Sequence, residues 1–562
     1  MRVNMFETDV LIIGGGMAAM RAAIAAADAG VDVAVVTKAP AAKSGASTMA
    51  GGGIAAALAI SDPSDSTKAH YNDMITVGKG LADPELARIN AEEAPARIQD
   101  LVSYGVRFRQ KDGQVHQSSI PGHSHPRVLH TSNGGSSFVN PLRRKMLSYP
   151  NVHLHDDVMA VRLFLDEGRV KGALCLDVKN GELSAFVAGA TIMATGGYQD
   201  IYPASSASCD VTGDGYVMAF EAGAELVDME IVLYYPTALL SPSSLRGMLI
   251  LYEMFLVDRG GPGARLVNVD GEDLIERYDR LPVRDELSRR IFNEVARGKG
   301  TERGGVFLDV SRSTVPLPQR TEAVKQITGY GLLTSVGFNV AEGRFEVGPA
   351  AHTVLGGIRI NSRCESTVPG LFAAGEAAGN IHGANRIGGN ALADTQVFGF
   401  RAGQFAAQFA KERGRPRLLD EKVAEAARPV QRIVEPKANP KDVLDVKNAI
   451  RQTMFRYVGP TRNEEGITSA IESVEMILKE DVPRIEVPLA PTAFNYSLVE
   501  ALEAGFMART AVLVCHAARL RRESRGHHFR SDYPVPDDSK PPQRTRICQR
   551  NGELVVELYP VS

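Results

Sequence analysis

The chain has 562 residues, which predicts several domains, and its 63 lysines and arginines nearly balance its 66 aspartates and glutamates. The resulting net charge of −3 does not support nucleic-acid binding. No apolar run reaches membrane-spanning length and no signal peptide is recognised after Arg2, so we expect a cytoplasmic protein that meets a membrane only through a partner.

The five cysteines are scattered along the chain and show no Cys-x-x-Cys spacing. This pattern argues against a disulfide framework, a zinc site and an iron–sulfur cluster within the chain, and it favours a reducing compartment. His123 and His125 have the spacing of metal ligands, but no cluster of carboxylates or cysteines accompanies them. No metal site is therefore predicted.

The most informative stretch lies near the N-terminus, where residues 9–13 form a short apolar run that is typical of a buried parallel strand. Gly14, Gly16 and Ala19 follow in the G-x-G-x-x-G/A spacing, and an alanine-rich helix is predicted over 17–29. Gly14 permits a tight turn, Gly16 lets the backbone approach a pyrophosphate, and Ala19 lets the helix pack closely. The pattern predicts a Rossmann-like dinucleotide-binding unit with a diphosphate at the helix start.

The second strand of this unit, predicted over 31–36, ends in an unusual way. Such a strand normally ends in an acidic residue that binds a ribose hydroxyl, whereas here Thr37 and Lys38 follow. Either Thr37 holds the ribose or the dinucleotide sits differently. The next segment, 39–53, is rich in Gly, Ala and Ser and could wrap closely around a ligand, which makes candidates of Ser44, Gly45, Gly52 and Gly53.

A second glycine turn follows a strand in the middle of the chain. A helix is predicted over 83–104, and strands over 152–155, 158–166, 169–178 and 185–197. The last strand ends in Ala194, Thr195 and Gly196, at a carboxyl end, where doubly wound folds place ligands. Asp214 opens the next helix and could supply the polar contact that is missing at Lys38.

The pattern changes between residues 233 and 347, where proline-rich turns and mixed short helices predict an inserted domain. Short apolar strands then return, followed by a glycine-rich loop and a helix, so the first domain resumes. Three helices are predicted beyond it, over 443–457, 466–479 and 497–522, and then one strand, over 553–558. The predicted division is 1–232 and 348–415 for the nucleotide-binding domain, 233–347 for the inserted domain, 416–522 for a helical domain and 523–562 for a C-terminal segment.

Taken together, the motifs resemble the flavoprotein subunits of succinate dehydrogenase and fumarate reductase, with L-aspartate oxidase as close kin. In this family Ser or Thr followed by Lys commonly replaces the acidic strand end, so Thr37 and Lys38 favour FAD. The resemblance implies an α/β fold, in which a Rossmann-like FAD-binding domain is interrupted by an α+β capping domain and followed by a helical domain and a short C-terminal segment. It rests on the segments GGGMAAMRAAI (14–24), ATGG (194–197), TGDG (212–215), YPTAL (235–239), PVRD (282–285), PAAHTVLGGI (349–358), GLFAAGEAAG (370–379), HGANRIGGNAL (382–392) and ESRGHHFRSDYP (523–534).

The resemblance also implies a reaction, the interconversion of a dicarboxylic alkane and alkene with hydride exchange at flavin N5. Arg284 matches the family's arginine acid/base, and Asp285 beside it could orient it or relay the proton. His352 matches the carboxylate-binding histidine, and Arg386 matches the carboxylate-clamping arginine, which also lies near the flavin. Further flavin neighbours are implied at Glu376, on a ribose or ribityl hydroxyl, and at Asn390, Ala391 and Leu392.

The chain departs from the family at the other end of the substrate pocket. Tyr235 stands where the family has a histidine, and a phenol brings no positive charge to a carboxylate. Apolar residues in 252–263 occupy the places of the family's Thr-Glu pair, and Glu253 lies about one helical turn too early. The substrate is therefore expected to be bulkier, or to carry only one carboxylate.

The loop 44–53 has no histidine of the kind that binds FAD covalently in some family members, so non-covalent FAD is predicted. Non-covalent FAD usually has a lower potential, which favours alkene reduction or oxidase behaviour over succinate oxidation.

Three functions stay open. The first is a flavoprotein subunit that exchanges electrons with an iron–sulfur partner, since this chain has no cluster ligands. The second is a free-standing oxidase of the L-aspartate oxidase type. The loop HSHPRVLHTSNGG (123–135) resembles the corresponding loop of that enzyme. The third is an electron relay without a substrate of its own, which the substituted pocket suggests and the retained Arg284, His352 and Arg386 oppose.

Overall fold

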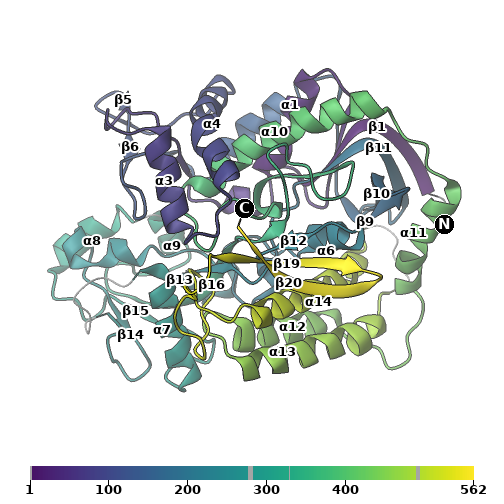
Figure 1. Ribbon diagram of the computed structural model, residues 1–562. Coiled ribbons are helices and arrows are strands. Elements are labelled where there is room, and N and C mark those ends of the chain that lie inside the picture. The colour runs from purple at the N-terminus through teal and green to yellow at the C-terminus, as the bar shows by residue number, and fades with distance from the viewer. Residues whose placement is uncertain (1–2, 276–282, 328, 489–493, 562) are drawn as a thin grey trace.

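The main sheet is organised around β1 (Val3–Ile13), which lies parallel between β2 (Val33–Thr37) and β11 (Leu183–Met193). The computed structural model describes residues 3–275, 283–327, 329–488 and 494–561 (Figure 1). The strand predicted over 9–13 is confirmed and begins six residues earlier. The sequence pattern missed this extension because most of its side chains are exposed, and its pairing with β11 leaves no local apolar signal.

The sheet has the strand order β8-β2-β1-β11-β10-β9, and the short strand β18 (Leu371–Ala373) adds in parallel to the last residues of β11. The strands predicted in this region are confirmed as β8 (Val152–Asp156), β9 (Val158–Asp166) and β10 (Arg169–Asp177). Strand β8 is parallel to β2, whereas β10 and β9 extend the sheet in antiparallel fashion. The carboxyl ends of β1, β2, β11 and β18 therefore meet at one edge, which is where doubly wound sheets bind ligands.

Helix α1 (Met17–Asp28) packs against the long helix α10 (Asn390–Arg413), as Figure 1 shows above the main sheet. Glycines of α10 allow the close contact, because a Cβ atom on Gly399 would lie 2.8 Å from the carbonyl oxygen of Ala18. A Cβ atom on Gly403 would lie 2.3 Å from the carbonyl oxygen of Ala22. Helices α1 and α10, which are far apart in the sequence, thus form one packed pair, and α1 begins directly after Gly14 and Gly16.

Further short elements complete this part of the protein. Helix α4, predicted over 83–104, runs from Pro84 to Ser103, and the Asp83 side chain caps it by accepting from the backbone N–H groups of Glu85 and Leu86. The others are α2 (Ala46–Met49), β3 (Gly53–Ala55), α3 (Thr67–Val77), β4 (Gln110–Lys111), β5 (Gln114–Val115), β6 (Gln117–Ser118), β7 (Val128–His130), α5 (Ser136–Met146), α6 (Asp214–Glu221), β12 (Leu226–Val227) and β17 (Gly357–Ile358).

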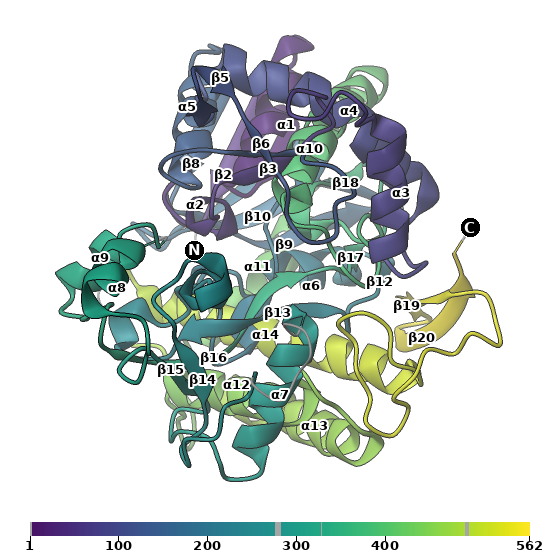
Figure 2. The same ribbon diagram turned by 90° about the vertical axis from the view of Figure 1, so that its left-hand side faces the viewer.

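The inserted part has a sheet and a core of its own. Its strand order is β13-β16-β15-β14, with all pairs antiparallel, and its core includes Phe255, Leu287, Leu308 and Phe345. Its elements are β13 (Val232–Leu239), β14 (Arg265–Val267), α7 (Arg284–Ala296), β15 (Val306–Asp309), α8 (Leu317–Val324), α9 (Tyr330–Ser335) and β16 (Arg344–Val354). In Figure 2, β13 and β16 lie between the main-sheet elements above and α7 below.

Helices and a hairpin form the rest of the chain. The three predicted helices are confirmed as α12 (Val443–Val458), α13 (Glu464–Met476) and α14 (Tyr496–Leu520), which Figure 1 shows below the hairpin, and α11 (Asp420–Ile433) precedes them. The predicted last strand is confirmed as β20 (Glu553–Pro560), but β19 (Gln543–Arg550) was missed because arginines interrupt its apolar pattern. The hairpin continues the sheet β17-β12-β19-β20, so the chain end is attached to the nucleotide-binding part. Within the described ranges, no helix is long and apolar enough to cross a membrane.

We predict that Gly14→Ala strongly destabilises the protein. Gly14 has φ +128°, and a Cβ atom there would lie 2.1 Å from the carbonyl oxygen of Ala194 on the neighbouring strand end. We expect a loss of about 3 kcal/mol or more of unfolding free energy, measured by thermal denaturation, together with loss of bound FAD. The control Gly30→Ala has a positive φ of +75° but open space around it, so it should cost only about 1 kcal/mol. Equal effects of the two variants would contradict the steric argument.

Candidate active site

A cavity of about 420 Å³ opens at the carboxyl edge of the main sheet. Its wall combines the strand ends of β1, β2 and β11 with residues of β13, β16 and α7, so the nucleotide-binding and inserted parts both contribute to it. Eighteen of the predicted site residues line it: Gly14, Gly16, Thr37, Lys38, Ser44, Gly45, Gly52, Gly53, Ala194, Thr195, Gly196, Asp214, Arg284, His352, Glu376, Arg386, Ala391 and Leu392.

Three predicted site residues do not line this cavity. Ala19 is fully buried within α1, where it packs in the core. Asn390, the first residue of α10, accepts a hydrogen bond from the buried His70 at 2.9 Å. Asp285 follows Arg284 on α7, and because consecutive helical residues point about 100° apart, its carboxylate turns away and pairs with Arg289 at 2.9 Å. Pro282 of the PVRD motif lies outside the described residues.

The start of α1 is suited to a diphosphate. Gly16 is the N-cap residue and provides no side-chain cap, so the helix start keeps backbone donors for a ligand. Ser47 accepts the N–H of Met17 at 3.1 Å and lies 3.2 Å from the position of a Cβ atom on Gly16. A side chain at Gly16 would crowd Ser47 at the helix start, where the sequence predicts the diphosphate.

Lys38 has carboxylate partners that come from distant parts of the chain. Its Nζ lies 2.9 Å from Glu503 Oε1 of α14, 3.3 Å from Asp214 Oδ2 and 3.0 Å from Thr212 Oγ1. Burial opposes the charged form, but Asp214 and Glu503 outweigh it and raise the pKa of Lys38. Asp214 therefore forms an ion pair with Lys38 in the cavity wall, and its role as the polar contact to the dinucleotide stays a prediction. Glu503 was missed, because a separation of 465 residues leaves no local signal.

Glu376 lies in the cavity wall with two donors on one oxygen. Its Oε1 accepts from Gln199 Nε2 at 2.6 Å and from the N–H of Val354 at 2.8 Å. Burial raises the pKa of Glu376 to about 7. A carboxyl group of this kind can exchange hydrogen bonds with a ribose or ribityl hydroxyl. The assignment of Glu376 to such a hydroxyl stays a prediction.

Arg386 and His352 provide donors for an anion. The guanidinium of Arg386 contacts only the carbonyl oxygen of Ile387, at 3.3 Å among the described residues, and its buried Nε has no partner there. Burial and the nearby Arg284 lower the pKa of Arg386 to about 10. Burial, Arg386 and Arg284 lower the pKa of His352 to about 3, so this histidine is neutral, and its Nδ1 lies 2.7 Å from Ser206 Oγ. A carboxylate would satisfy these donors.

Arg284 and Tyr235 line the same cavity, and Glu253 lies behind them and contacts both. Its guanidinium lies 4.9 Å from the centre of the Tyr235 ring, and its Nε lies 3.6 Å from Glu253 Oε1. Tyr235 donates its hydroxyl hydrogen to Glu253 Oε2 at 3.2 Å. Burial and the charge of Glu253 raise the pKa of Tyr235, so the phenol is neutral.

Glu253 precedes the places of the family's Thr-Glu pair by about one helical turn, yet it contacts Arg284. The chain after β13 turns back along this strand, with Leu249 bridged to Ala238 and the N–H of Ile250 bonded to the carbonyl oxygen of Thr237. The next turn therefore places Glu253 beside Tyr235 and Arg284. Counting residues along the sequence could not show this, because the register is set by backbone pairing between the two segments.

His123 and His125, which have the spacing of metal ligands, contact other protein groups. His123 Nε2 lies 2.8 Å from the carbonyl oxygen of Gly388, and His125 Nδ1 lies 2.8 Å from Asp62. Among the described residues no group of three or more His, Cys, Asp or Glu side chains is arranged to hold a metal ion. The contact to Gly388 instead links this loop to the cavity wall.

Comparisons with known proteins agree with this site. Residues 9–392 match the family model of the FAD binding domain, and residues 447–562 match that of the fumarate reductase flavoprotein C-term. The CoM/CoB fumarate reductase of Methanothermobacter marburgensis has a subunit that is 38% identical over 95% of this chain and 96% of its own length. The chloroplastic L-aspartate oxidase of Arabidopsis thaliana is 30% identical, over 95% and 82% of the two chains. The structure of Mycobacterium smegmatis Sdh1 in complex with UQ1 superimposes with a TM-score of 0.92 at 32% identity, and covers 99% of this chain and 95% of that one.

The fold and the site define an FAD-dependent oxidoreductase. The chain belongs to the family of succinate dehydrogenase and fumarate reductase flavoproteins, whose C-terminal region it also contains. The predicted architecture is thereby confirmed. The individual domain boundaries stay predictions.

We predict that Glu376 makes the stability of the FAD-free protein depend on pH. Its folded pKa of about 7 lies above the ordinary value of 4.5, so its stability contribution is full below about pH 4.5 and is lost as the pH rises through 7. The loss is on the order of 3 kcal/mol. Glu376→Gln should flatten the fall in melting temperature between pH 5 and 8, and the exposed control Glu435→Gln should not. A wild-type slope in Glu376→Gln would refute the assignment.

Proposed function

We propose that this chain is the catalytic flavoprotein of a fumarate-reductase-like or succinate-dehydrogenase-like enzyme, which interconverts a carboxylate-bearing alkene and alkane. The observation that carries this proposal is that Arg284, His352 and Arg386 share one cavity with the residues of the dinucleotide site. FAD bound there would supply hydride exchange at N5. The side chains around it would bind the substrate and move the proton.

Arg386 and His352 are proposed to anchor one carboxylate of the substrate. Among the described residues, Arg386 offers guanidinium N–H groups without a carboxylate partner, and the neutral His352 is oriented by Ser206. A carboxylate held by these donors fixes the neighbouring carbon atoms in the cavity, and such positioning lowers the entropic part of the barrier.

Arg284 is proposed to hold and donate the proton. During reduction of an alkene, one carbon receives the hydride and the adjacent carbon receives the proton, so the acid must reach that second carbon. Glu253, 3.6 Å from the Arg284 Nε and 28% exposed, can pass a proton from solvent back to the arginine. The hydroxyl of Tyr235 holds Glu253 in this place.

An iron–sulfur protein is the proposed electron partner. The M. marburgensis relative is itself named as a subunit, and that relative is matched over nearly its whole length. Within the described ranges, four of the five cysteines are buried singly and none is grouped with other metal ligands, so cluster ligands would have to come from another chain.

A free-standing oxidase of the L-aspartate oxidase type is the second candidate. The 30% identity to the Arabidopsis enzyme supports it, and so does the resemblance of the loop 123–135. Here His123 and Arg127 join this loop to the cavity wall at Gly388. A non-catalytic electron relay is less well supported, because it gives no reason for three anion-binding side chains in the flavin cavity.

The proposal predicts that the reduced flavin is reoxidised by unsaturated carboxylates. The purified protein would be reduced without oxygen and mixed with fumarate or with unsaturated monocarboxylates, while flavin absorbance is recorded. Reoxidation by an alkene supports the proposed enzyme, and peroxide formed from aspartate in air supports the second candidate. If no alkene reoxidises the flavin, the alkene-reductase proposal is wrong.

A matched pair of variants separates chemistry from folding in this experiment. Arg284→Ala should slow reoxidation by about 10³-fold while FAD content stays at the wild-type level, because it removes the proton donor. Arg297→Ala changes an exposed arginine near the other end of α7 and should leave the rate unchanged. Equal rates in both variants would remove Arg284 from the mechanism.

Non-covalent attachment of FAD is also proposed. The loop 44–53 contains no histidine, and the cavity-lining His130 on β7, opposite Gly53, has its Nε2 2.7 Å from Ser118 Oγ. Precipitation of the protein with acid should therefore leave the yellow flavin in the supernatant. A flavin that remains on the peptide containing His130, detected by mass spectrometry, would contradict the proposal.

A further inference from the structure

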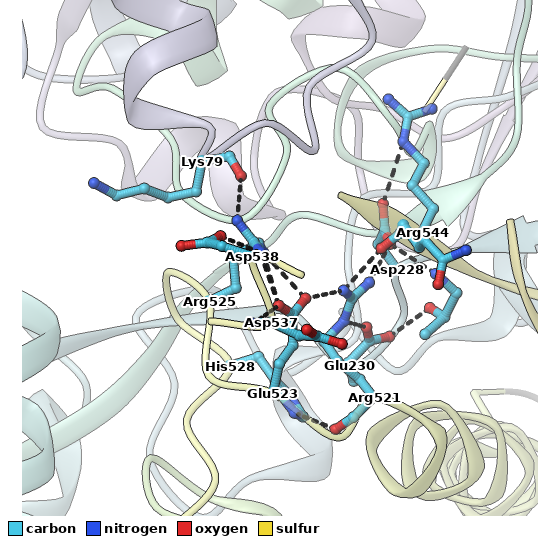
Figure 3. Close-up of polar contacts among 12 residues, drawn as sticks. Lys79, Asp228, Glu230, Arg521, Glu523, Arg525, His528, Asp537, Asp538 and Arg544 are labelled. Carbon is cyan, nitrogen blue, oxygen red and sulfur yellow. Dashed lines mark hydrogen bonds and ion pairs between the residues drawn. The ribbon is translucent and has the colours of Figure 1, made fainter. Parts of the chain in front are cut away.

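The C-terminal segment that follows α14 is held rigidly by buried ion pairs (Figure 3). Arg521 is only 2% exposed and contacts three carboxylates, those of Asp228 at 3.0 Å, Glu230 at 2.5 Å and Glu523 at 2.9 Å. Glu523 in turn lies 2.8 Å from Arg525. Because a buried charged group without its partners is costly, this network fixes the segment relative to β12 and β13.

The same segment contacts the loop that carries Arg386. Gly526 has φ +57°, and a Cβ atom there would lie 2.1 Å from the carbonyl oxygen of Ala384. The N–H of His527 donates to that same carbonyl at 3.0 Å, and His527 Nε2 lies 3.1 Å from Asn385 Oδ1. Two hydrogen bonds thus hold the residues immediately before Arg386.

The segment also contacts the start of α7, which carries Arg284. The guanidinium of Arg289 lies 4.6 Å from the centre of the Phe529 ring and is paired with Asp285. His527 itself is buried, and its ring lies close enough to Asp285 for the two to interact electrostatically. Residues 526–529 therefore lie between the neighbours of both cavity arginines.

The two cavity arginines belong to parts of the protein with different hydrophobic cores. Arg284 belongs to the inserted part, which has its own core, and Arg386 belongs to a loop before α10 in the nucleotide-binding part. Both guanidinium groups must nevertheless reach one small substrate, and a shift of about 1 Å in such a site can cost about a hundredfold in rate. A contact that ties the two parts together near the arginines is therefore expected to matter for the reaction.

We propose that His527 is a positioning residue that holds Arg386 in register with Arg284 by tying its loop to the C-terminal segment. His527 does not line the cavity, so it acts through Asn385 and not by contact with the substrate. The kinetic consequence rests on the proposed function. The structural consequence, restraint of the loop 380–389, does not depend on it.

The test compares His527→Ala, Asn385→Ala, the double variant and His527→Gln, with the variant His516→Ala, at a partly exposed histidine of α14, as control. In FAD-loaded protein, hydrogen–deuterium exchange of peptides covering 380–389 should speed up at least tenfold in both single variants. The KM for fumarate should rise about tenfold with a smaller change in kcat. The double variant should be no worse than either single variant, since both remove the same hydrogen bond. His527→Gln keeps a donor and should stay within about threefold of the wild type.

Several outcomes would overturn the inference. It is wrong if His527→Ala leaves loop exchange and KM at the His516→Ala level, or if the two single effects multiply in the double variant. If His527→Ala fails to fold, Asn385→Ala removes the same bond from the other side and decides the matter. If the wild type does not turn over fumarate, the proposed substrate fails, whereas loop exchange still decides the role of His527.

Discussion

Two guanidinium groups of like charge, Arg284 and Arg386, line the same cavity, and the charged and polar groups around them are arranged to tolerate this repulsion. The burial of Arg386, and after it the repulsion by Arg284, lower the pKa of Arg386 to about 10. Glu253 on one side and the neutral state of His352 on the other keep the positive charge from growing further. An anionic substrate relieves the repulsion, so the same arrangement that costs free energy in the protein favours binding of a carboxylate.

Buried ion pairs join parts of the protein that have separate cores. Lys38, at the end of β2, meets Glu503 of α14, and Glu503 also binds Lys447 of α12 at 2.8 Å. Arg521 likewise forms ion pairs that join the end of the helical region to the turn before β13. Such pairs contribute little net stability compared with apolar packing, but each is costly when one partner is removed. They therefore select one docking arrangement of the parts, which is what a cavity built from several of them requires.

The cavity wall around Tyr235 differs from the pattern that the family resemblance implies. A neutral phenol replaces a histidine, and the acidic partner of Arg284 comes from Glu253, in a turn that folds back along β13. Leu249 and Leu251 from the same returning segment also line the cavity. Here the positive charge of Arg284 is paired with Glu253, whereas the guanidinium of Arg386 has no carboxylate partner among the described residues.

The amino-acid sequence by itself determined the βαβ unit, the cofactor class, the helical region and most of the cavity wall. It could do so because the apolar period of 9–13, the spacing of Gly14 and Gly16 and the alanines of α1 are local signals. Arg284, His352 and Arg386 were also found, through motifs that lie within a few residues of each. Only the tertiary structure showed that Glu253 contacts Arg284 and that Glu503 forms an ion pair with Lys38. It also showed that Asp285 turns away from the cavity and that His527 bonds to Asn385, next to Arg386. The contacts of Glu253, Glu503 and His527 join residues 31, 465 and 142 positions apart, and the direction of Asp285 depends on helix rotation. Residue spacing along the sequence shows neither.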